Sequence, residues 1–230
     1  RSPTRPHTYL YRPAAGRIDP LALASPTCHT LDPVTDALRF LRRHHAGVLV
    51  ADEAIYPRRF VLDNAGGRPV LTLPLGVEEA ESIVLHVPDE GIPSLQLLVD
   101  LEWLDPNISA HGGATDRFLI HHAKAEDSRF AMLKVLDAKW TEGRAAVEEI
   151  IVANPLASIE PRLCKRLNGD RSRLGAIVRE IGRREVFDPV AVGVDSDGVS
   201  VRTRTGLVRV EFDSARSPSD AEATIQAWTG

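Results

Sequence analysis

The chain has 230 residues, a formal net charge of −4, 43% hydrophobic residues and 26% charged residues. These values are ordinary for a globular protein with a sizeable core, in one large or two modest domains. The charge provides no general basic surface, so we expect no nucleic acid and no membrane as partners. No apolar run approaches the about 20 residues that span a bilayer, and the first residues lack the apolar core of a signal peptide. We therefore expect a cytoplasmic protein.

Residues 1–31 are expected to form an extended N-terminal arm, because the five prolines in this segment disfavour regular structure. Such an arm either lies across a neighbouring subunit or frays, and the sequence leaves both possibilities open. Cys28 and Cys164 are the two cysteines of the chain. Two reduced thiols are favoured over a disulfide, as is usual in the cytosol.

Residues 32–153 are predicted to be rich in β-strands. Asp32 and Pro33 are typical of a helix start, and apolar residues follow at helical spacing as far as Leu41. A short helix is expected at 115–122. Short apolar or alternating runs predict strands at 47–52, 59–63, 69–73, 82–87, 95–101, 130–140 and, at an edge, 148–152. Many short strands with few helices favour a small closed or partly open barrel.

Residues 154–230 are predicted to form a separate α-β-β-β-α module. Pro161 can begin a helix, and the segment 171–185 is amphipathic. Alternating valines, a turn at Asp197-Gly198 and a second turn at Thr205-Gly206 predict three short strands. A Ser-Pro-Ser-Asp sequence at 217–220 is typical of the start of a closing helix.

Three motifs of this module resemble the C-terminal domain of HugZ-type heme-utilisation proteins. Their residues are Leu167, Asn168 and Asp170 on the helix, Gly193, Asp195, Gly198 and Arg202 in the hairpin, and Arg209, Val210 and Phe212 in the last strand. In that family this domain follows a pyridoxamine-phosphate-oxidase-like split β-barrel. One position departs from the pattern, because Arg171 stands where the family has histidine. Any histidine chemistry at that position would be lost here.

The resemblance implies an α+β fold, a split β-barrel (FMN-binding-like) followed by the α-β-β-β-α domain. It also implies a homodimer and a tetrapyrrole or flavin ligand. The serine- and threonine-rich strand of flavin-binding members is not recognisable. The corresponding segment, 69–76, offers only Thr72, and the acidic residues Glu78, Glu79 and Glu81 that follow it would repel a phosphate.

His121 and His122 are the candidate metal ligands, because one imidazole can bind heme iron axially. Adjacent helical residues point about 100° apart, so at most one of them faces a given ligand. The plainer interpretation is a pair of histidines at a helix end.

Four further residues are candidate cofactor contacts. Arg58 and Arg59 begin one strand, and Lys139 and Trp140 end another. Strand ends meet at the rim of a barrel, where cations can hold a phosphate or a heme propionate and a ring can stack on a flat ligand. Solvated charges that protect strand edges are the alternative.

These patterns leave three functional hypotheses. The first is heme binding, in heme utilisation or degradation. The second is a flavin-dependent oxidoreductase on the same barrel, with FMN as cofactor. The third is a non-catalytic, degenerate barrel that acts as a regulatory or scaffolding partner. No motif specifies a reaction, so the sequence leaves open whether the protein is an enzyme.

Overall fold

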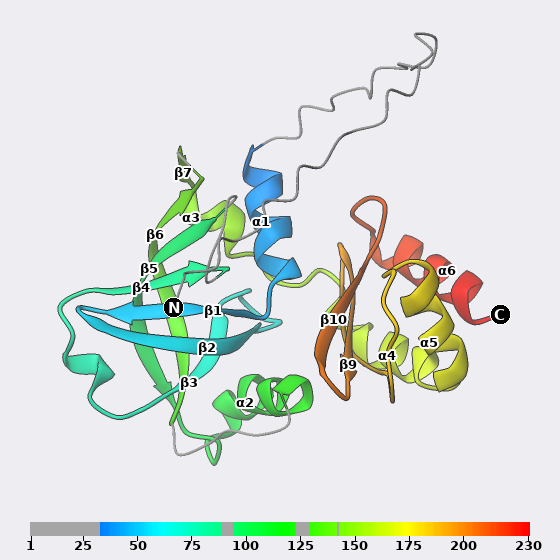
Figure 1. The fold of residues 1–230 in the computed structure, drawn as a ribbon, viewed down its shortest axis with the longest axis horizontal. Coiled ribbons are helices and arrows are strands. Elements are labelled where there is room, and N and C mark those ends of the chain that lie inside the picture. Colours follow the sequence, from blue (N-terminus) through cyan, green and yellow to red (C-terminus); the bar gives the residue numbers. More distant parts are fainter. Residues whose placement is uncertain (1–32, 89–93, 123–128, 142) are drawn as a thin grey trace, which may run out of the picture. The chain divides into compact units, whose positions relative to one another are not determined.

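The structure is a computed structural model that describes residues 33–88, 94–122, 129–141 and 143–230. The expected N-terminal arm, with Cys28, lies outside these ranges. Residues 32–230 form one compact unit (Figure 1). Its first part contains α1 (Pro33–Arg43), β1 (Ala46–Ala51), β2 (Ala54–Leu62), β3 (Pro69–Leu73), the 3₁₀ turn η1 (Val77–Glu79), β4 (Ile83–Val87), β5 (Leu95–Leu104), α2 (Ser109–His122), β6 (Arg129–Trp140), β7 (Gly143–Ala145) and α3 (Val147–Ile150).

Six antiparallel strands close into a barrel. Their order is β3-β2-β1-β4-β5-β6, and β3 also pairs with β6, so that Leu71 lies opposite Ala131. The short strand β7 pairs with the far end of β6, beyond the part that contacts β3. Strands β2 and β3 form a hairpin, in which Leu62 lies opposite Pro69. The predicted α+β class is confirmed, and the barrel is closed.

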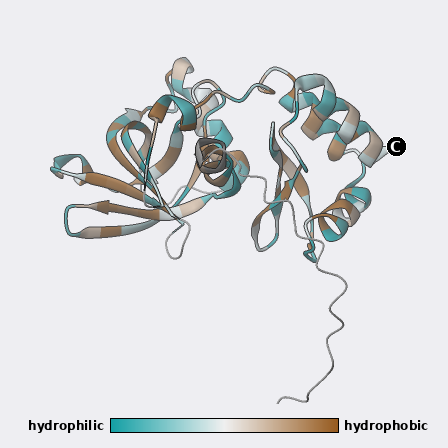
Figure 2. Cartoon of the chain, turned by 90° about the horizontal axis from the view of Figure 1, so that it is seen from above, coloured by the Kyte–Doolittle hydropathy of each residue, from teal (hydrophilic) through white to brown (hydrophobic). Residues whose placement is uncertain are grey.

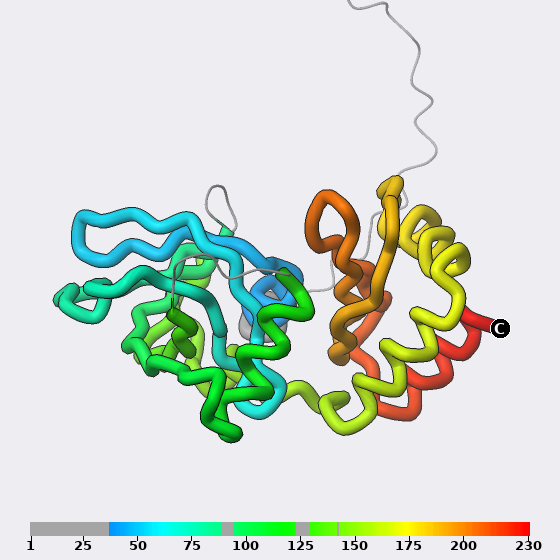
Figure 3. Tube along the Cα trace, turned by 90° about the horizontal axis from the view of Figure 1, so that it is seen from below, coloured from blue at the N-terminus to red at the C-terminus, as the bar shows by residue number. Residues whose placement is uncertain are grey.

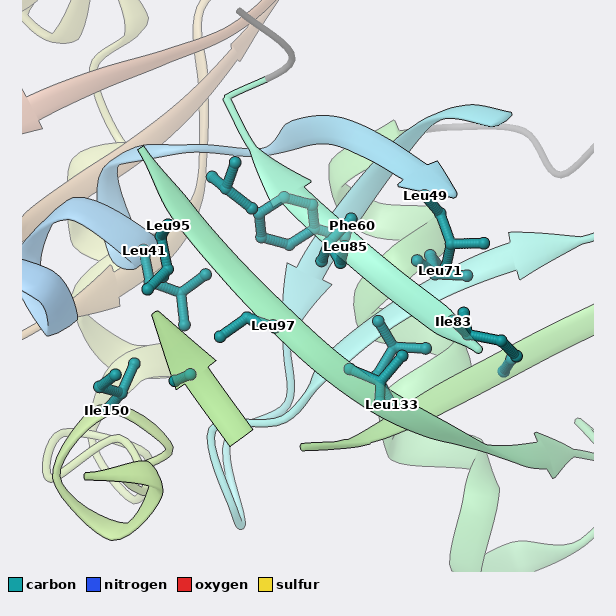
Figure 4. Close-up of a cluster of buried hydrophobic side chains, with 14 of the residues drawn as sticks. Leu41, Leu49, Phe60, Leu71, Ile83, Leu85, Leu95, Leu97, Leu133 and Ile150 are labelled. Atoms are coloured by element: carbon teal, nitrogen blue, oxygen red, sulfur yellow. The ribbon is translucent and has the colours of Figure 1, made fainter. Parts of the chain in front are cut away.

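The barrel encloses the larger hydrophobic core, because apolar side chains alternate with solvated ones along strands such as β1 and β5. Leu49, Phe60 and Leu97 are fully buried in it (Figure 4). Helix α1 adds Ala37 and Leu41 to the same cluster. The first helix is thereby packed on the barrel through the apolar face that its sequence predicted.

The second part of the unit has its own core. It contains α4 (Glu160–Leu167), α5 (Arg171–Glu180), β8 (Val190–Asp195), β9 (Gly198–Thr203), β10 (Gly206–Glu211) and α6 (Pro218–Thr229). The strands form a three-stranded antiparallel sheet, and Figure 3 follows the chain through it from α5 to α6. Two helices, rather than one, precede the sheet. The Asp170 side chain accepts a hydrogen bond from the Arg173 amide and so begins α5 as a new helix.

Three elements differ from the prediction. Helix α2 begins at Ser109, six residues before the expected start. Glycine pairs favour loops, but Gly112 and Gly113 are accommodated in this helix. The expected strand at 148–152 is the short helix α3, whose Ile150 is fully buried in the barrel core. Helix α5 ends at Glu180 rather than near 185.

Helix α1 also contacts the second sheet through its basic side chains. Arg42 forms an ion pair with Asp197 at 2.6 Å, and both side chains are at least nine-tenths buried. Arg39 donates to the Phe212 carbonyl at 2.8 Å. Hydrophobic residues, brown in Figure 2, run through the strands and helices of both parts. None of the helices in the described ranges is long and apolar enough to cross a membrane.

Candidate functional site: a cavity lined by histidines and arginines

A cavity of about 510 Å³ is lined by an unusual set of side chains. Four are histidines and five are arginines, supplied by the end of α1, by β2, by the end of α2 and by the β9–β10 hairpin. We call it the His–Arg cavity; its charged and imidazole residues are Arg43, His44, His45, Arg59, His121, His122, Arg202, Arg204 and Arg209. The described residues contribute no acidic side chain to its lining. A volume in this range is typical of small-molecule sites.

Two of the five arginines are neutralised by carboxylates. Arg209 pairs with Asp195, and Arg43 pairs with Glu211 through two of its three guanidinium nitrogens. Burial acts to raise the pKa of Asp195, but the charges of Arg209 and Arg42 and the hydrogen bonds that the carboxylate accepts together lower it. The hydrogen bond with Arg43 likewise lowers the pKa of Glu211. These two arginines therefore stabilise the fold through their ion pairs, and the carboxylates partly neutralise their charges.

The other three arginines have no carboxylate partner among the described residues. Arg202 donates to the Ile120 carbonyl at the end of α2, while Arg59 and Arg204 are exposed at the cavity. Guanidinium groups remain charged at every physiological pH. The cavity therefore concentrates positive charge that an anionic ligand would neutralise.

Three of the histidines are held neutral at pH 7. Burial lowers the pKa of His121 to about 3, with a further contribution from the charge on Arg117. Burial also lowers the pKa of His122, and lowers that of His45 well below its ordinary value. Arg209 adds to the effect at His45. A neutral imidazole keeps a nitrogen lone pair, as a metal ligand must.

The hydrogen bonds of these rings identify the nitrogen that carries the proton. Because a carbonyl oxygen only accepts, Nδ1 of His121 donates to the Arg117 carbonyl at 2.9 Å, and Nε2 of His122 donates to the Phe60 carbonyl at 3.0 Å. His44 follows the same rule, since its Nδ1 lies 2.8 Å from the Phe40 carbonyl.

His45 has a side-chain partner instead. Its Nε2 lies 3.2 Å from the Ser200 hydroxyl oxygen, which in turn accepts a hydrogen bond from Arg209 at 3.1 Å. Ser200 can therefore donate its hydroxyl hydrogen to the lone pair of neutral His45. The ring centroids of His45 and His121 are 6.1 Å apart.

The structure brings part of the predicted site together. His121, His122 and Arg59 all line the His–Arg cavity. Arg58 instead stacks over Tyr56, with its guanidinium carbon 5.3 Å from the ring centroid. Lys139 is exposed on β6, and Trp140 packs against Phe40 next to the barrel core; neither lines this cavity.

Sequence reasoning missed the residues that the second sheet supplies. Arg202, Arg204 and Arg209 come from the β9–β10 hairpin, whose sequence V-R-T-R-T-G-L-V-R is visibly basic. Alternation along β9 and β10 could have placed Arg202 and Arg209 on one face of this hairpin. The folded contact between the hairpin and α2, through the Ile120 carbonyl, had no signal in the sequence.

A second cavity, of about 560 Å³, is lined in part by other residues of α2, among them Gly113 and Arg117. Its walls are mainly apolar, with Met132, Ile120 and Val192 among them. Its buried polar group is the pair of Arg117 and Glu160, 2.8 Å apart. Glu160 also accepts hydrogen bonds from the side chain of Asn64 and from the Val194 amide. Its hydrogen-bonding capacity is thus already used within the protein.

Groups of three or more histidine, cysteine or carboxylate side chains suited to a metal ion do not occur in the described ranges. One imidazole is sufficient to complete the coordination of a metal that is carried within a larger ligand.

No family model matches this chain, and a search of curated proteins gives no significant match. Solved structures do resemble it. A protein of unknown function from Agrobacterium tumefaciens, 15% identical, matches with a TM-score of 0.64 over 86% of this chain and 95% of that one. This likeness concerns the fold alone. A heme-binding protein from Mycobacterium smegmatis, 18% identical, matches with a TM-score of only 0.39 over 86% and 96% of the two chains. A score that low carries no functional argument.

Proposed function

We propose that the His–Arg cavity binds heme, and that the protein acts in the handling of this ligand. The observation that carries the proposal is the combination of neutral imidazoles and arginines without carboxylate partners on one cavity. Heme carries an iron atom in its macrocycle and two carboxylates on its side chains. It therefore needs an imidazole for the iron and cations for the carboxylates. Heme, when bound, supplies the iron chemistry, and the protein supplies binding and orientation.

The arginines hold the carboxylates in this proposal. Arg59 and Arg204 have no side-chain partner among the described residues and are solvent-accessible, so their guanidinium groups can turn toward an entering anion. Arg202 is fixed by the Ile120 carbonyl and retains further N–H groups. Paired N–H donors match the two oxygens of a carboxylate, and such charge-assisted bonds are stronger than neutral ones.

The imidazoles supply the group that faces the iron. The four histidines of the cavity, His121 and His122 among them, lie on the same cavity as these arginines, so one of the four rings can face the iron. The remaining proposed contacts, Arg58, Lys139 and Trp140, lie on other parts of the barrel and are left out of the heme site.

A flavin is the second candidate ligand. The same arginines could hold the phosphate of FMN, because phosphate and carboxylate recognition use the same fork of donors. Flavin binding gives no role to the four imidazoles, and for that reason we place it second. A barrel that binds neither ligand and acts through protein contacts is the third possibility.

The resemblance to HugZ-type proteins supports the finer parts of the proposal. On that resemblance we propose that the barrel is of the pyridoxamine-phosphate-oxidase-like split type and that the protein is a homodimer. The mass in solution, measured by light scattering after size-exclusion chromatography, tests the dimer. A monomer at micromolar concentration would contradict it.

The experiment titrates the purified protein with hemin and, separately, with FMN. Heme binding predicts a shifted Soret band that saturates at one hemin per chain. The double variant Arg59→Gln/Arg204→Gln should weaken hemin binding at least about tenfold, since a charge-assisted bond contributes more than about 1.4 kcal/mol. The control Arg162→Gln/Arg179→Gln removes two exposed arginines outside both cavities and should bind as the wild type does.

Two outcomes contradict heme binding. Hemin binding that does not saturate, or that both double variants weaken equally, shows nonspecific adsorption of hemin. Saturable binding of FMN, weakened by the cavity variant and not by the control, would favour the flavin-dependent alternative.

A further inference from the structure

His44 is placed on the wall of the His–Arg cavity by the end of α1. Its Nδ1 donates to the Phe40 carbonyl at 2.8 Å, so the proton is on Nδ1 and the lone pair is on Nε2. The ring also packs on the Phe40 ring, with centroids 4.2 Å apart. Two contacts with one residue therefore fix both the orientation and the tautomer of this imidazole.

This arrangement is the one that metal-binding histidines use. In such a histidine one ring nitrogen binds the metal. The other ring nitrogen donates its N–H to a carboxylate or a backbone carbonyl, and this hydrogen bond orients the ring and raises its basicity. In His44 the Phe40 carbonyl fills that position, and Nε2 engages no group among the described residues. The ring lies just beyond the C-terminus of an 11-residue helix, where the partial negative charge favours a cationic centre.

His121 is less able to reach a bulky ligand. Its side chain is 3% exposed, and its Nε2 faces the backbone of β8. A methyl group added at Gly193 would lie only 2.9 Å from this nitrogen. A flat ligand that is several rings wide has no room between Nε2 and the strand.

His122 and His45 are limited in other ways. Because Nε2 of His122 is occupied by the Phe60 carbonyl, its free lone pair is on Nδ1. Nδ1 is next to the ring carbon that carries the side chain, so the residue's own backbone obstructs the approach of a large planar group. Nε2 of His45 is engaged with Ser200. Of the four rings, His44 alone offers an Nε2 that no described residue obstructs or occupies.

We infer that His44 is the residue that binds the iron of heme in the His–Arg cavity, through Nε2. The inference rests on the proposed function and names the coordinating ring. The bond forms from the Nε2 lone pair, while Nδ1 keeps its hydrogen bond to the Phe40 carbonyl. The Phe40 carbonyl positions the ring, and Arg59, Arg202 and Arg204 remain available for the carboxylates.

The test compares hemin complexes of the full chain and of three single variants: His44→Ala, His122→Ala and His86→Ala. His86, on β4, is the matched control, since it does not line the cavity. Absorbance and electron paramagnetic resonance spectra report the iron ligand independently of any activity. Circular dichroism of the unloaded proteins confirms that each variant is folded.

His44→Ala should lose the imidazole-type spectrum, with hemin affinity lowered about tenfold or more. Free imidazole at millimolar concentration should restore the spectrum, because it can occupy the space of the deleted ring. His86→Ala should keep the wild-type spectrum, and His122→Ala should keep an imidazole ligand on the iron even where the altered cavity wall lowers its affinity for hemin. Rescue by imidazole would not be expected if His44 only stabilised the end of α1.

The inference is overturned if the His44→Ala complex has the wild-type spectrum, whether or not His122→Ala loses it. That result leaves heme binding itself intact. Wild-type protein that fails to bind hemin at a saturable site contradicts the proposed function instead, so the two failures are distinguishable.

Discussion

The Trp140 indole lies against the ring of Phe40, with centroids 4.7 Å apart and planes inclined by 58°. Phe40 in turn holds His44 through its carbonyl and its ring. The sequence suggested Trp140, beside Lys139, as a stacking surface for a ligand; in the structure its ring contacts Phe40. It supports the residue that orients an imidazole of the His–Arg cavity.

Loss of the Arg42 side chain should destabilise the protein strongly. Arg42→Ala would leave the buried Asp197 carboxylate without its partner, which typically reduces the free energy of unfolding by about 3–5 kcal/mol. The control Arg162→Ala breaks an exposed pair with Glu222 and should change it by less than about 1 kcal/mol. Urea unfolding measures both. Equal losses in the two variants would show that burial of the Arg42 pair has no energetic consequence.

An alanine at Gly193 should disturb the region of His121. The added methyl group would lie 2.9 Å from His121 Nε2 and 3.3 Å from atoms of Arg117 and Glu160, so these side chains must move. Overpacking of this kind destabilises by about 1–3 kcal/mol. Gly113→Ala is the contrasting variant, because its methyl group would meet nothing within 4 Å. It should stabilise α2 by up to about 1 kcal/mol.

Thermal and urea unfolding compare the two glycine variants. The order of stability should be Gly113→Ala, wild type, Gly193→Ala. A Gly193→Ala protein as stable as the wild type would mean that β8 and α2 can separate without loss.

The protein should lose stability as the pH falls below about 6.5. In the folded protein the pKa of His121 is about 3, and those of His45 and His122 are also lowered. Between these values and 6.5 the unfolded chain binds protons that the folded protein does not, so acid favours unfolding. Each such histidine contributes a slope of up to about 1.4 kcal/mol per pH unit. Above pH 6.5 this stabilisation is fully present.

The measurement is the free energy of unfolding in urea from pH 8 to pH 4, for the wild type and for His121→Asn. Asparagine can keep the hydrogen bond to the Arg117 carbonyl and does not titrate. The variant should show a shallower loss in acid. At pH 8 the histidine is neutral in both the folded and the unfolded protein. The difference in the free energy of unfolding between variant and wild type at this pH therefore measures packing alone. Parallel curves at all pH values would contradict the buried neutral His121.

The Cys164 thiol should react slowly with alkylating reagents. Burial, with a further contribution from the charge on Glu160, raises its pKa to about 12, so little thiolate is present at pH 8. In a Cys28→Ser background, iodoacetamide should label the folded protein about two to three orders of magnitude more slowly than the urea-unfolded chain. Mass spectrometry follows the labelling, and similar rates in the two states would show that the thiol is accessible.

Elements with a strong local signal were predictable from the sequence. Helix α1 has a regular apolar stripe, β6 follows a long apolar run that alternates in part, and the Asn64-Ala65-Gly66-Gly67 segment forms the turn of the β2–β3 hairpin. Each of these signals depends on neighbours within a few residues. The predicted helix was shorter than α2, because glycine has a low helix propensity. In the structure the low helix propensity of Gly112 and Gly113 is outweighed by the packing of Phe118 and Thr115.

The site was only partly predictable because it joins segments that are far apart in the chain. His44 and Arg202 are 158 positions apart, yet both line one cavity. Cationic side chains are common at the C-terminal end of a helix, where they match the helix dipole, so His44 gave no separate signal of a site. The closing pair of β3 and β6 is likewise a long-range contact, and no local pattern specifies it.

Helix α1 is fastened along two faces, with Ala37 and Leu41 in the barrel core and Arg39 and Arg42 bonded to the second sheet. A side chain carried at the end of such a helix has little freedom to adjust to its ligand. The cavity wall next to His44 should therefore select its ligand by shape, accepting one that fits the existing geometry and rejecting others of equal charge. The rigidity of this wall would thus determine, before any ligand binds, which ligands can be accommodated.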